Sequence, residues 1–421
     1  MSPRLHTLPN GVRVVCDPMP GLDTFALSVV FGGGARWEPK NRSGWSHLLE
    51  HMVFKGAGGR SAQQIAEAIE AVGAQSNAAT GYERTSYQIR ALAGRLPLSM
   101  EILADMALYP TLDPDELERE KQVVAQEIAE SFDTPDDHVF EVAQTTAFGG
   151  TALGRPILGS VKSIGAATPL KLGEWRAALY PPERTVVSVA GAADENEVLH
   201  LAERFFGSTE PGMRTPGPEL AVFVGGDQAI ARKIEQANLV WQLPGPGARD
   251  RAWFDARLFA ELLGGGMASR LFQEAREKRG LAYNISAWAV SYEETGQIGV
   301  FAGAAADDAE ALGVLVAEQI LAMGEGVSGE ELARGKAQLE TSLFMARESP
   351  VGRAERAAAQ VLLFGRVIPP EETRAGVNAV TSDSLRALVA DILAPKKSAN
   401  ATLGPRKAAG AGPAFTKALF G

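Results

Sequence analysis

Hydrophobic and polar residues alternate along the first part of the chain in patterns that predict β-strands. "LPNGVRVVCDPM" indicates the start of a hairpin with Asn10-Gly11 as its turn, because this dipeptide favours tight hairpin turns. "TFALSVVFGGGARWE" predicts a buried strand that ends in a glycine cluster. Two further strands are predicted by "AQSNAAT" and "RTSYQIRAL".

The segments between and after these strands have the spacing of hydrophobic and polar residues that is typical of helices. Residues 44–56 predict a helix with a mixed face, and "RSAQQIAEAIEAVGAQ" predicts a second one. Ser61 and Gln64 have the spacing of a capping box at its start, and Gly73 is a stop signal at its end. A third helix is expected near 95–108. A fourth begins at Asp113-Pro114 and runs through "DELEREKQVVAQEIAESF".

The second half of the chain repeats part of this pattern. Residues 82–128 and 292–343 both run from a tyrosine and an acidic pair through a strand and a helix to a capped helix. A stretch rich in Gly and Pro lies between the halves. We therefore expect an α+β fold of two similar halves, each a mostly antiparallel sheet with helices packed on one face. The predicted domains are 1–209 and 222–421, joined by a linker at 210–221.

Composition narrows the class of protein. A chain of 421 residues with 45% hydrophobic and 22% charged residues suits two globular domains. A net charge of −10 argues against nucleic acid as a partner, and without a long apolar run we expect no membrane span. The single Cys16 excludes an internal disulfide framework and a multi-thiolate zinc site. "MSPRLHTLPNGVRVV" lacks the apolar core of a secretory signal, so we expect the cytoplasm.

The segment "GWSHLLEHMVFKG" carries candidate chemistry. His47 and His51 are four residues apart, so on a helix both imidazoles point from one face and can bind one metal ion. Glu50 precedes His51 and is placed to act as a general base without binding the metal. The alternative is a chance cluster on an amphipathic helix. The apolar residues around the pair oppose this alternative, because unpaired polar groups are costly to bury.

A catalytic zinc site needs a third protein ligand. The acidic helix that begins at Asp113 offers Glu120 and Glu127, which are seven residues apart and therefore share a face. One of them could bind zinc while the other supports a ligand histidine. Spacing alone does not choose between them, and an acidic helix face is often simply solvated. The second half of the chain has no matching histidine pair, so a single site belongs to the first half.

"HLLEHMVFKG" together with Glu127 in "EREKQVVAQEIAE" resembles the pitrilysin/insulinase family of zinc peptidases, also called inverzincins. "LGRPILGSVKSI" and "GGGMASRLFQEAREKRGLAY" match the family too, so the resemblance covers nearly the whole chain. The chain is most similar to half-size bacterial members and to the catalytic subunit of the mitochondrial processing peptidase. The glycine cluster Gly264–Gly266 is short, unlike the long glycine-rich loop of that enzyme's noncatalytic subunit, which weakens any claim to presequence recognition.

The resemblance implies roles for individual residues. His47, His51 and Glu127 would bind one Zn²⁺ per chain, with Glu50 as the general base for water at the metal and Glu120 as a supporting acid. In "REKRGLAY", Arg276 and Tyr283 match the family's arginine–tyrosine pair near the substrate. The resemblance also places the edge strand that binds the peptide backbone at Asn77, Ala78, Ala79 and Thr80.

The expected function is that of a zinc-dependent metalloendopeptidase that hydrolyses unfolded peptides or oligopeptides inside a dimeric chamber. Family members enclose their site between half-shells, so we expect a homodimer in which each zinc faces Arg276 and Tyr283 of the partner chain. The alternative is a noncatalytic or partner-dependent subunit of a processing-peptidase-like complex. Such relatives typically lose a ligand or the base, and this chain keeps all four residues.

Overall fold

The computed structural model describes residues 3–210 and 217–421. The chain forms two compact units. The first takes its described residues from Met1–Ile128, Pro156–Glu219 and Phe344–Pro369, and the second from Ala129–Arg155, Leu220–Leu343 and Pro370–Gly421. Each unit therefore contains most of one half of the sequence and a segment of the other half. The predicted linker at 210–221 lies in part outside the described residues.

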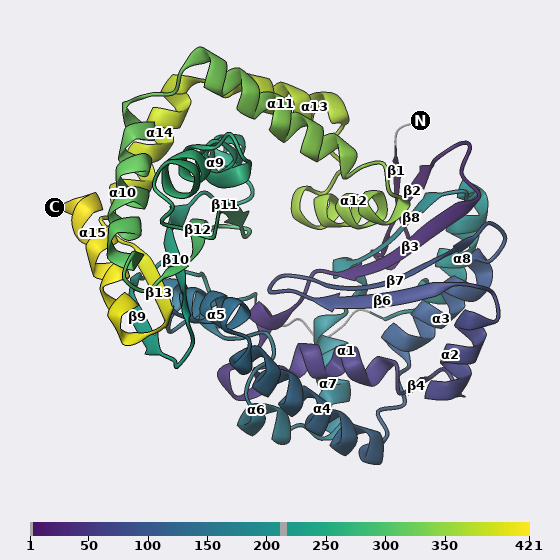
Figure 1. Ribbon diagram of the computed structural model, residues 1–421. Coiled ribbons are helices and arrows are strands. Elements are labelled where there is room, and N and C mark those ends of the chain that lie inside the picture. The colour runs from purple at the N-terminus through teal and green to yellow at the C-terminus, as the bar shows by residue number, and fades with distance from the viewer. Residues whose placement is uncertain (1–2, 211–216) are drawn as a thin grey trace. The chain divides into compact units, whose positions relative to one another are not determined.

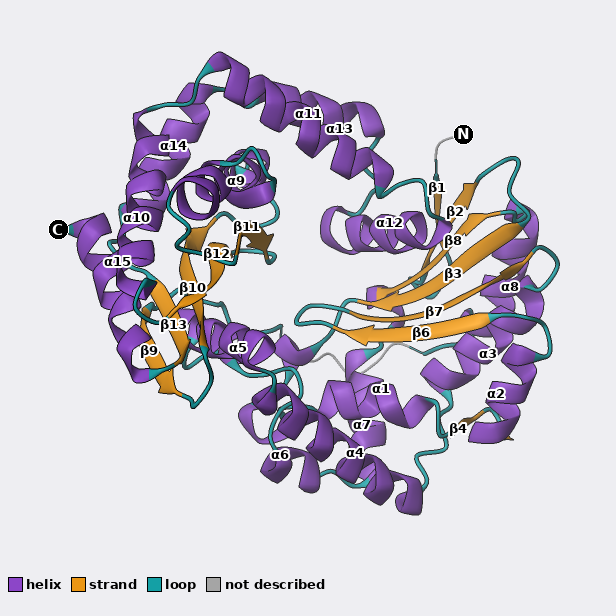
Figure 2. Cartoon of the chain, viewed as in Figure 1, coloured by secondary structure: helices purple, strands orange, loops and turns teal. Residues whose placement is uncertain are grey.

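The first unit is built on a six-stranded sheet, drawn in orange in Figure 2. The strand order is β1-β2-β8-β3-β7-β6, and all neighbours are antiparallel except the parallel pair β2 and β8. The strands are β1 Arg4–Thr7, β2 Arg13–Pro18, β3 Thr24–Phe31, β6 Gln75–Thr80, β7 Thr85–Leu92 and β8 Thr185–Gly191. A separate short pair joins β4 Gly56–Ala57 to β5 Arg60–Ser61. The predicted hairpin is confirmed, because β1 and β2 pair with each other and the turn between them contains Gly11, whose φ is 95°.

Helices of the same half of the sequence cover one face of this sheet (Figure 1). They are α1 Trp45–Val53, α2 Ala62–Glu70, α3 Leu96–Leu108, α4 Pro114–Asp133 as far as Ile128, α6 Val161–Gly165, α7 Pro169–Leu179 and α8 Glu195–Phe206. Their apolar faces pack against Phe25, Leu27 and Val29 of β3. The predicted capping box is confirmed, because the side chains of Ser61 and Gln64 each accept a hydrogen bond from the other residue's backbone amide.

The opposite face of the sheet is covered by α12 Pro350–Phe364, from the second half of the sequence (Figure 1). Ala357, Ala358 and Val361 of α12 pack against Val30 and Val186. Arg353 of the same helix forms two hydrogen bonds of 2.6 Å to the carboxylate of Asp17 in β2. The sequence did not predict this helix on the sheet, and its position explains why both faces of β3 are apolar.

The Arg353–Asp17 pair yields a stability prediction. Asp17 is 2% exposed, so replacing Arg353 with Met leaves a buried carboxylate without its charged partner. We expect Arg353→Met to lower the free energy of unfolding by about 3 kcal/mol. Chemical denaturation measures this change. A double variant with Asp17→Asn should recover most of the loss, and equal stability of the single and double variants would contradict the assignment.

The second unit is built on a five-stranded sheet of order β11-β12-β10-β13-β9, in which only β13 and β9 are parallel. The strands are β9 Gly226–Ala231, β10 Gln236–Gly245, β11 Asn284–Ser291, β12 Gly296–Ala305 and β13 Ala399–Gly404. The helices are α5 Pro135–Phe148, α9 Trp253–Ala260, α10 Ala309–Glu325, α11 Gly329–Met345 as far as Leu343, α13 Pro370–Ala379, α14 Ser382–Leu393 and α15 Ala411–Phe420. Helix α5, from the first half of the sequence, packs Val139 and Ala143 on Val240 and Leu403 of this sheet.

The order of elements confirms the predicted α+β fold of two similar halves. An edge strand, its neighbour and two helices follow one another as β6-β7-α3-α4 in the first half and as β11-β12-α10-α11 in the second. Short 3-10 turns lie at Ala35–Trp37, Lys40–Arg42, Ala152–Gly154, Pro182–Arg184 and Arg406–Gly410. Within the described residues no single helix has the length and apolar composition to cross a membrane. α10 and α11 pass that test only as a pair, bent by 106°.

Candidate active site and metal centre

Helix α1 carries His47, Glu50 and His51 and is packed firmly against the core. Its Leu48, Leu49, Met52 and Val53 are fully buried in the core of the first unit. The carboxylate of Glu38 accepts hydrogen bonds from the backbone amides of Gly44 at 2.8 Å and Ser46 at 2.6 Å. A carboxylate at this end of a helix satisfies free amides and suits the helix dipole. Glu38 thus fixes the start of α1, a role that sequence reasoning missed because six residues separate it from the helix start.

Helix α4 brings Glu127 to the two histidines. The Oε2 atom of Glu127 lies 3.8 Å from Nε2 of His47 and 3.5 Å from Nε2 of His51. One ligand atom from each of the three residues lies within 4.8 Å of the other two. Two ligand atoms bound to one zinc at about 2.1 Å and a tetrahedral angle are about 3.4 Å apart. The observed separations are therefore close to those that one zinc ion requires.

The protonation and hydrogen bonding of these groups also suit a metal. Burial and the neighbouring His51 lower the pKa of His47 to about 4, so its imidazole is neutral near pH 7. A neutral imidazole is the form that binds metals. Oε2 of Glu127 is buried and has no hydrogen-bond donor among the described residues. A buried carboxylate oxygen without a donor is costly, and a bound cation would satisfy it.

Glu120 lies behind His51 rather than among the three grouped ligand atoms. Its Oε2 atom is 2.9 Å from Nδ1 of His51, which leaves Nε2 of that ring facing Glu127. Its Oε1 atom is 2.7 Å from the ammonium of Lys55. Burial opposes the charged form of Glu120, but the hydrogen bonds from Lys55 and His51 outweigh it and lower its pKa. A carboxylate that orients a ligand histidine in this way is common at metal sites.

Lys55 was not predicted from the sequence, and its contact with Glu120 gives a testable consequence. Without the ammonium, Glu120 is a buried carboxylate with one fewer hydrogen bond and orients His51 less firmly. We expect Lys55→Met to weaken zinc binding by about tenfold, at the lower end of the effect of such supporting groups. Lys55→Arg should retain most of the affinity. Competition with a chelating dye measures both, and unchanged affinity in Lys55→Met would contradict this role.

Glu50 points from α1 toward the end of β6. Its Oε2 atom accepts a hydrogen bond of 2.5 Å from Oγ1 of Thr80. Burial raises the pKa of Glu50, while the hydrogen bond from Thr80 and the charge of His51 act in the opposite direction. Glu50 is thus a partly desolvated carboxylate next to the three grouped ligand atoms, as a general base for water at that point would need to be.

Strand β6 lies at one edge of the first sheet, with α1 packed beside it (Figure 2). Its side chains alternate, so Asn77 and Ala79 are exposed while Ala78 packs toward the core and Thr80 reaches Glu50. Among the described strands only β7 pairs with β6, so the outer backbone groups of β6 are available to an added strand.

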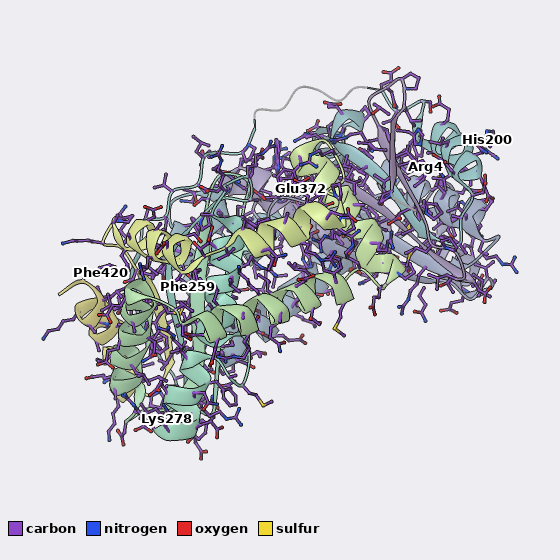
Figure 3. All side chains as sticks on the ribbon, turned by 90° about the horizontal axis from the view of Figure 1, so that it is seen from above. Arg4, His200, Phe259, Lys278, Glu372 and Phe420 are labelled. Atoms are coloured by element: carbon purple, nitrogen blue, oxygen red, sulfur yellow. The ribbon has the colours of Figure 1, made fainter. Side chains whose placement is uncertain are left out.

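Arg276 and Tyr283 belong to the second unit. Arg276 lies in a π-helical segment, Phe272–Lys278, with its guanidinium 4.8 Å from the centre of the Phe272 ring. Lys278, labelled in Figure 3, ends that segment. Tyr283 precedes β11, its amide donates to the carbonyl of Gly303, and its side chain is 63% exposed. Both side chains are exposed, and their role toward a substrate stays a prediction.

Comparisons with known proteins are consistent with this geometry. The family model described as insulinase, peptidase family M16, matches residues 13–161, and the model described as peptidase M16 inactive domain matches residues 166–339. A protein of Rickettsia felis named as an uncharacterized zinc protease is 35% identical over 382 residues, which cover 90% of this chain and 92% of that protein. The chain belongs to the insulinase (M16) family of peptidases. The predicted family is confirmed.

Other similar proteins agree with this chain in length and fold. The uncharacterized zinc protease YmxG of Bacillus subtilis is 33% identical over 91% of this chain and 94% of its own. The crystal structure of a protease from Helicobacter pylori superimposes with a TM-score of 0.88 at 21% identity, covering 96% of this chain and all of that one. A chain of complex III from Candida albicans gives 0.87 at 18% identity, covering 99% of both chains. These structures establish the fold, and the names of the relatives in Rickettsia felis and Bacillus subtilis indicate zinc.

Proposed function

We propose that this protein is a zinc-dependent endopeptidase that hydrolyses unfolded peptides. One observation carries the proposal: ligand atoms of His47, His51 and Glu127 converge within 4.8 Å of one another. The carboxylate of Glu50 lies beside them, at the end of the open edge strand β6. A metal-ligand group, a base and a peptide-binding edge are the components that peptide hydrolysis at a metal requires.

Each residue has a distinct part in this proposal. His47, His51 and Glu127 would hold one zinc ion per chain, and Glu120 would orient His51. Bound zinc would act as a Lewis acid that lowers the pKa of water and polarises the scissile carbonyl. Glu50 takes the proton from the attacking water and returns it to the amine that leaves. Its burial supports this part, because a desolvated carboxylate is a stronger base.

The edge strand determines the class of substrate. A peptide in extended conformation can add to β6 through backbone hydrogen bonds at Asn77, Ala78, Ala79 and Thr80. Backbone pairing selects for conformation more than for sequence, so cleavage should be broad. A folded protein does not present an extended strand with free backbone groups. We therefore propose unfolded peptides as substrates.

Arg276 and Tyr283 would complete the site by donating hydrogen bonds to the substrate carbonyl as negative charge develops on it. We propose a homodimer in which they act on the zinc of the partner chain. A mixed dimer of Glu50→Gln and Tyr283→Phe chains tests this arrangement. If the pair acts across chains, one intact site per mixed dimer keeps about half of the wild-type rate. If it acts within its own chain, the mixed dimer is nearly inactive.

A noncatalytic subunit is the other reading. The similarity in fold to a chain of complex III does not favour it, because similarity at 18% identity concerns the fold alone. The presence of both histidines, Glu127 and the base in one cluster supports the enzyme instead.

A pair of substrates tests directly whether the protein is restricted to unfolded chains. One substrate is a small domain with a known destabilising mutation, and the other is the same domain in its stable form. We expect the protein to cleave the unfolded variant and to leave the stable domain intact over the same period, as seen by mass spectrometry. Equal cleavage of both would contradict the proposed restriction to unfolded chains, and cleavage of neither would contradict the proposed activity.

A further inference from the structure

The end of strand β6 and the base on α1 are joined by a single side chain. Oγ1 of Thr80 donates to Oε2 of Glu50 at 2.5 Å, and it also lies 3.5 Å from the carbonyl of Ser46. A hydroxyl has one proton to donate, and the shorter contact to a carboxylate is the stronger one. The hydroxyl proton of Thr80 is therefore committed to Glu50, with the Ser46 contact at the limit of hydrogen bonding.

This contact ties the carboxylate of Glu50 to the end of β6. Oε2 has the hydroxyl of Thr80 as its donor, and the backbone of Thr80 also forms a hydrogen bond to the carboxylate. Both bonds act to lower the pKa of Glu50 against the larger effect of burial. A glutamate carboxylate that accepts a hydrogen bond from a fixed donor is restricted in rotation about its Cγ–Cδ bond. The direction in which the carboxylate points is then fixed by Thr80.

The backbone that carries Thr80 is itself anchored. The next residue, Gly81, donates its amide to the carbonyl of Arg84 at 2.8 Å and accepts from the amide of Ala35 at 3.0 Å. Thr80 also pairs with Thr85 in the register of β6 and β7. The hydroxyl of Thr80 therefore projects from a fixed point at the end of the strand that a peptide would extend.

We propose that Thr80 is a positioning residue for the general base, and that through it a peptide paired on β6 helps to hold Glu50 in its reactive orientation. This inference rests on the proposed function, because it assigns Glu50 its part in hydrolysis. Thr80 has no direct contact with the reacting atoms, and its effect passes through Glu50.

Two substitutions of Thr80 separate the effect of its hydroxyl from the effect of its shape. Thr80→Val keeps the shape and strand preference of the side chain but removes the donor, and Thr80→Ser keeps the donor. We expect Thr80→Val to lower kcat about ten- to a hundredfold, the effect of a misplaced catalytic group, with KM changed less than about threefold. Thr80→Ser should retain kcat within about threefold. Zinc content and thermal midpoint should equal those of the wild type in both variants.

Crystal structures of the wild type and both variants supply a readout that needs no turnover. Glu50 should occupy one conformer in the wild type and in Thr80→Ser, and a different conformer or several in Thr80→Val. The inference would be overturned by a wild-type kcat in Thr80→Val or by equal losses of kcat in Thr80→Val and Thr80→Ser. An unchanged Glu50 conformer in Thr80→Val would overturn it as well. If the wild type cleaves no peptide, the proposed function fails, and the conformers of Glu50 alone decide whether Thr80 positions it.

Discussion

A Glu50→Gln variant should bind zinc as the wild type does and hydrolyse peptides about a thousandfold more slowly. Glutamine has nearly the same shape as glutamate, but its amide cannot accept the proton of water. General bases typically contribute about 10²–10⁴ in rate, which sets the size of the expected loss. Glu50 is absent from the group of ligand atoms formed by His47, His51 and Glu127, so zinc binding should be unaffected.

Kinetics with a fluorogenic peptide and elemental analysis of the purified protein measure the two parts of this prediction. Glu70→Gln is a matched control, because Glu70 ends the exposed face of α2 and lies outside the site. This control should keep the wild-type rate. A Glu50→Gln protein that cleaves at close to the wild-type rate would show that another group removes the proton. A Glu50→Gln protein without zinc would show that Glu50 is a ligand.

A Glu127→Gln variant should lose its zinc. Glu127 supplies the only carboxylate in the group of ligand atoms that the described residues form, and a neutral amide is a much weaker zinc ligand. Two histidines alone leave the ion open to solvent and chelators. We expect the zinc content to fall from about one per chain to near zero after dialysis, with activity lost in proportion.

Thermal unfolding gives a second measurement of the same prediction. Zinc held at a hundred times its dissociation constant adds about 2.7 kcal/mol to the stability of the state that binds it. A chelator should therefore lower the thermal midpoint of the wild type and leave that of Glu127→Gln unchanged. Glu130→Gln is the control, since Glu130 is exposed on the same helix three residues later. Zinc retained by Glu127→Gln would point to a different third ligand.

Local patterns in the sequence predicted much of the fold because they depend on neighbouring residues. The turn at Asn10-Gly11, the capping box at Ser61 and the strands β6 and β7 all appear where the patterns place them. The helix predicted for 44–56 ends at Val53, three residues early. Gly56, the last residue of that segment, begins the short strand β4 instead, because it adopts a φ of 139° that a helix does not allow.

Contacts between distant segments could not be predicted in the same way. The apolar face of α12 shows that the helix is buried, but nothing in its residues says that it covers β3 and β8 of the first sheet. In the site, seven-residue spacing left Glu120 and Glu127 as equal candidates. The structure places Glu127 beside both Nε2 atoms and Glu120 beside Nδ1 of His51.

Supporting contacts were missed for the same reason. Glu38 caps α1, Lys55 binds Glu120 and Thr80 binds Glu50 through contacts that depend on how the helix and sheet pack. Polar and charged residues of these types are common on protein surfaces, so their presence in the sequence does not single them out. The relevant signal is burial beside another charge, and that becomes visible only in three dimensions.

The most direct test of the central claim is to incubate the purified protein alone with an unstructured peptide of about 20–30 residues and to identify products by mass spectrometry. The same reaction is run with Glu50→Gln, with a chelator, and with the chelator followed by excess zinc. We predict fragments from the wild type only, none in the chelator, and their return with zinc. A zinc-loaded wild type that yields no fragments, or fragments that Glu50→Gln yields equally, would contradict the account.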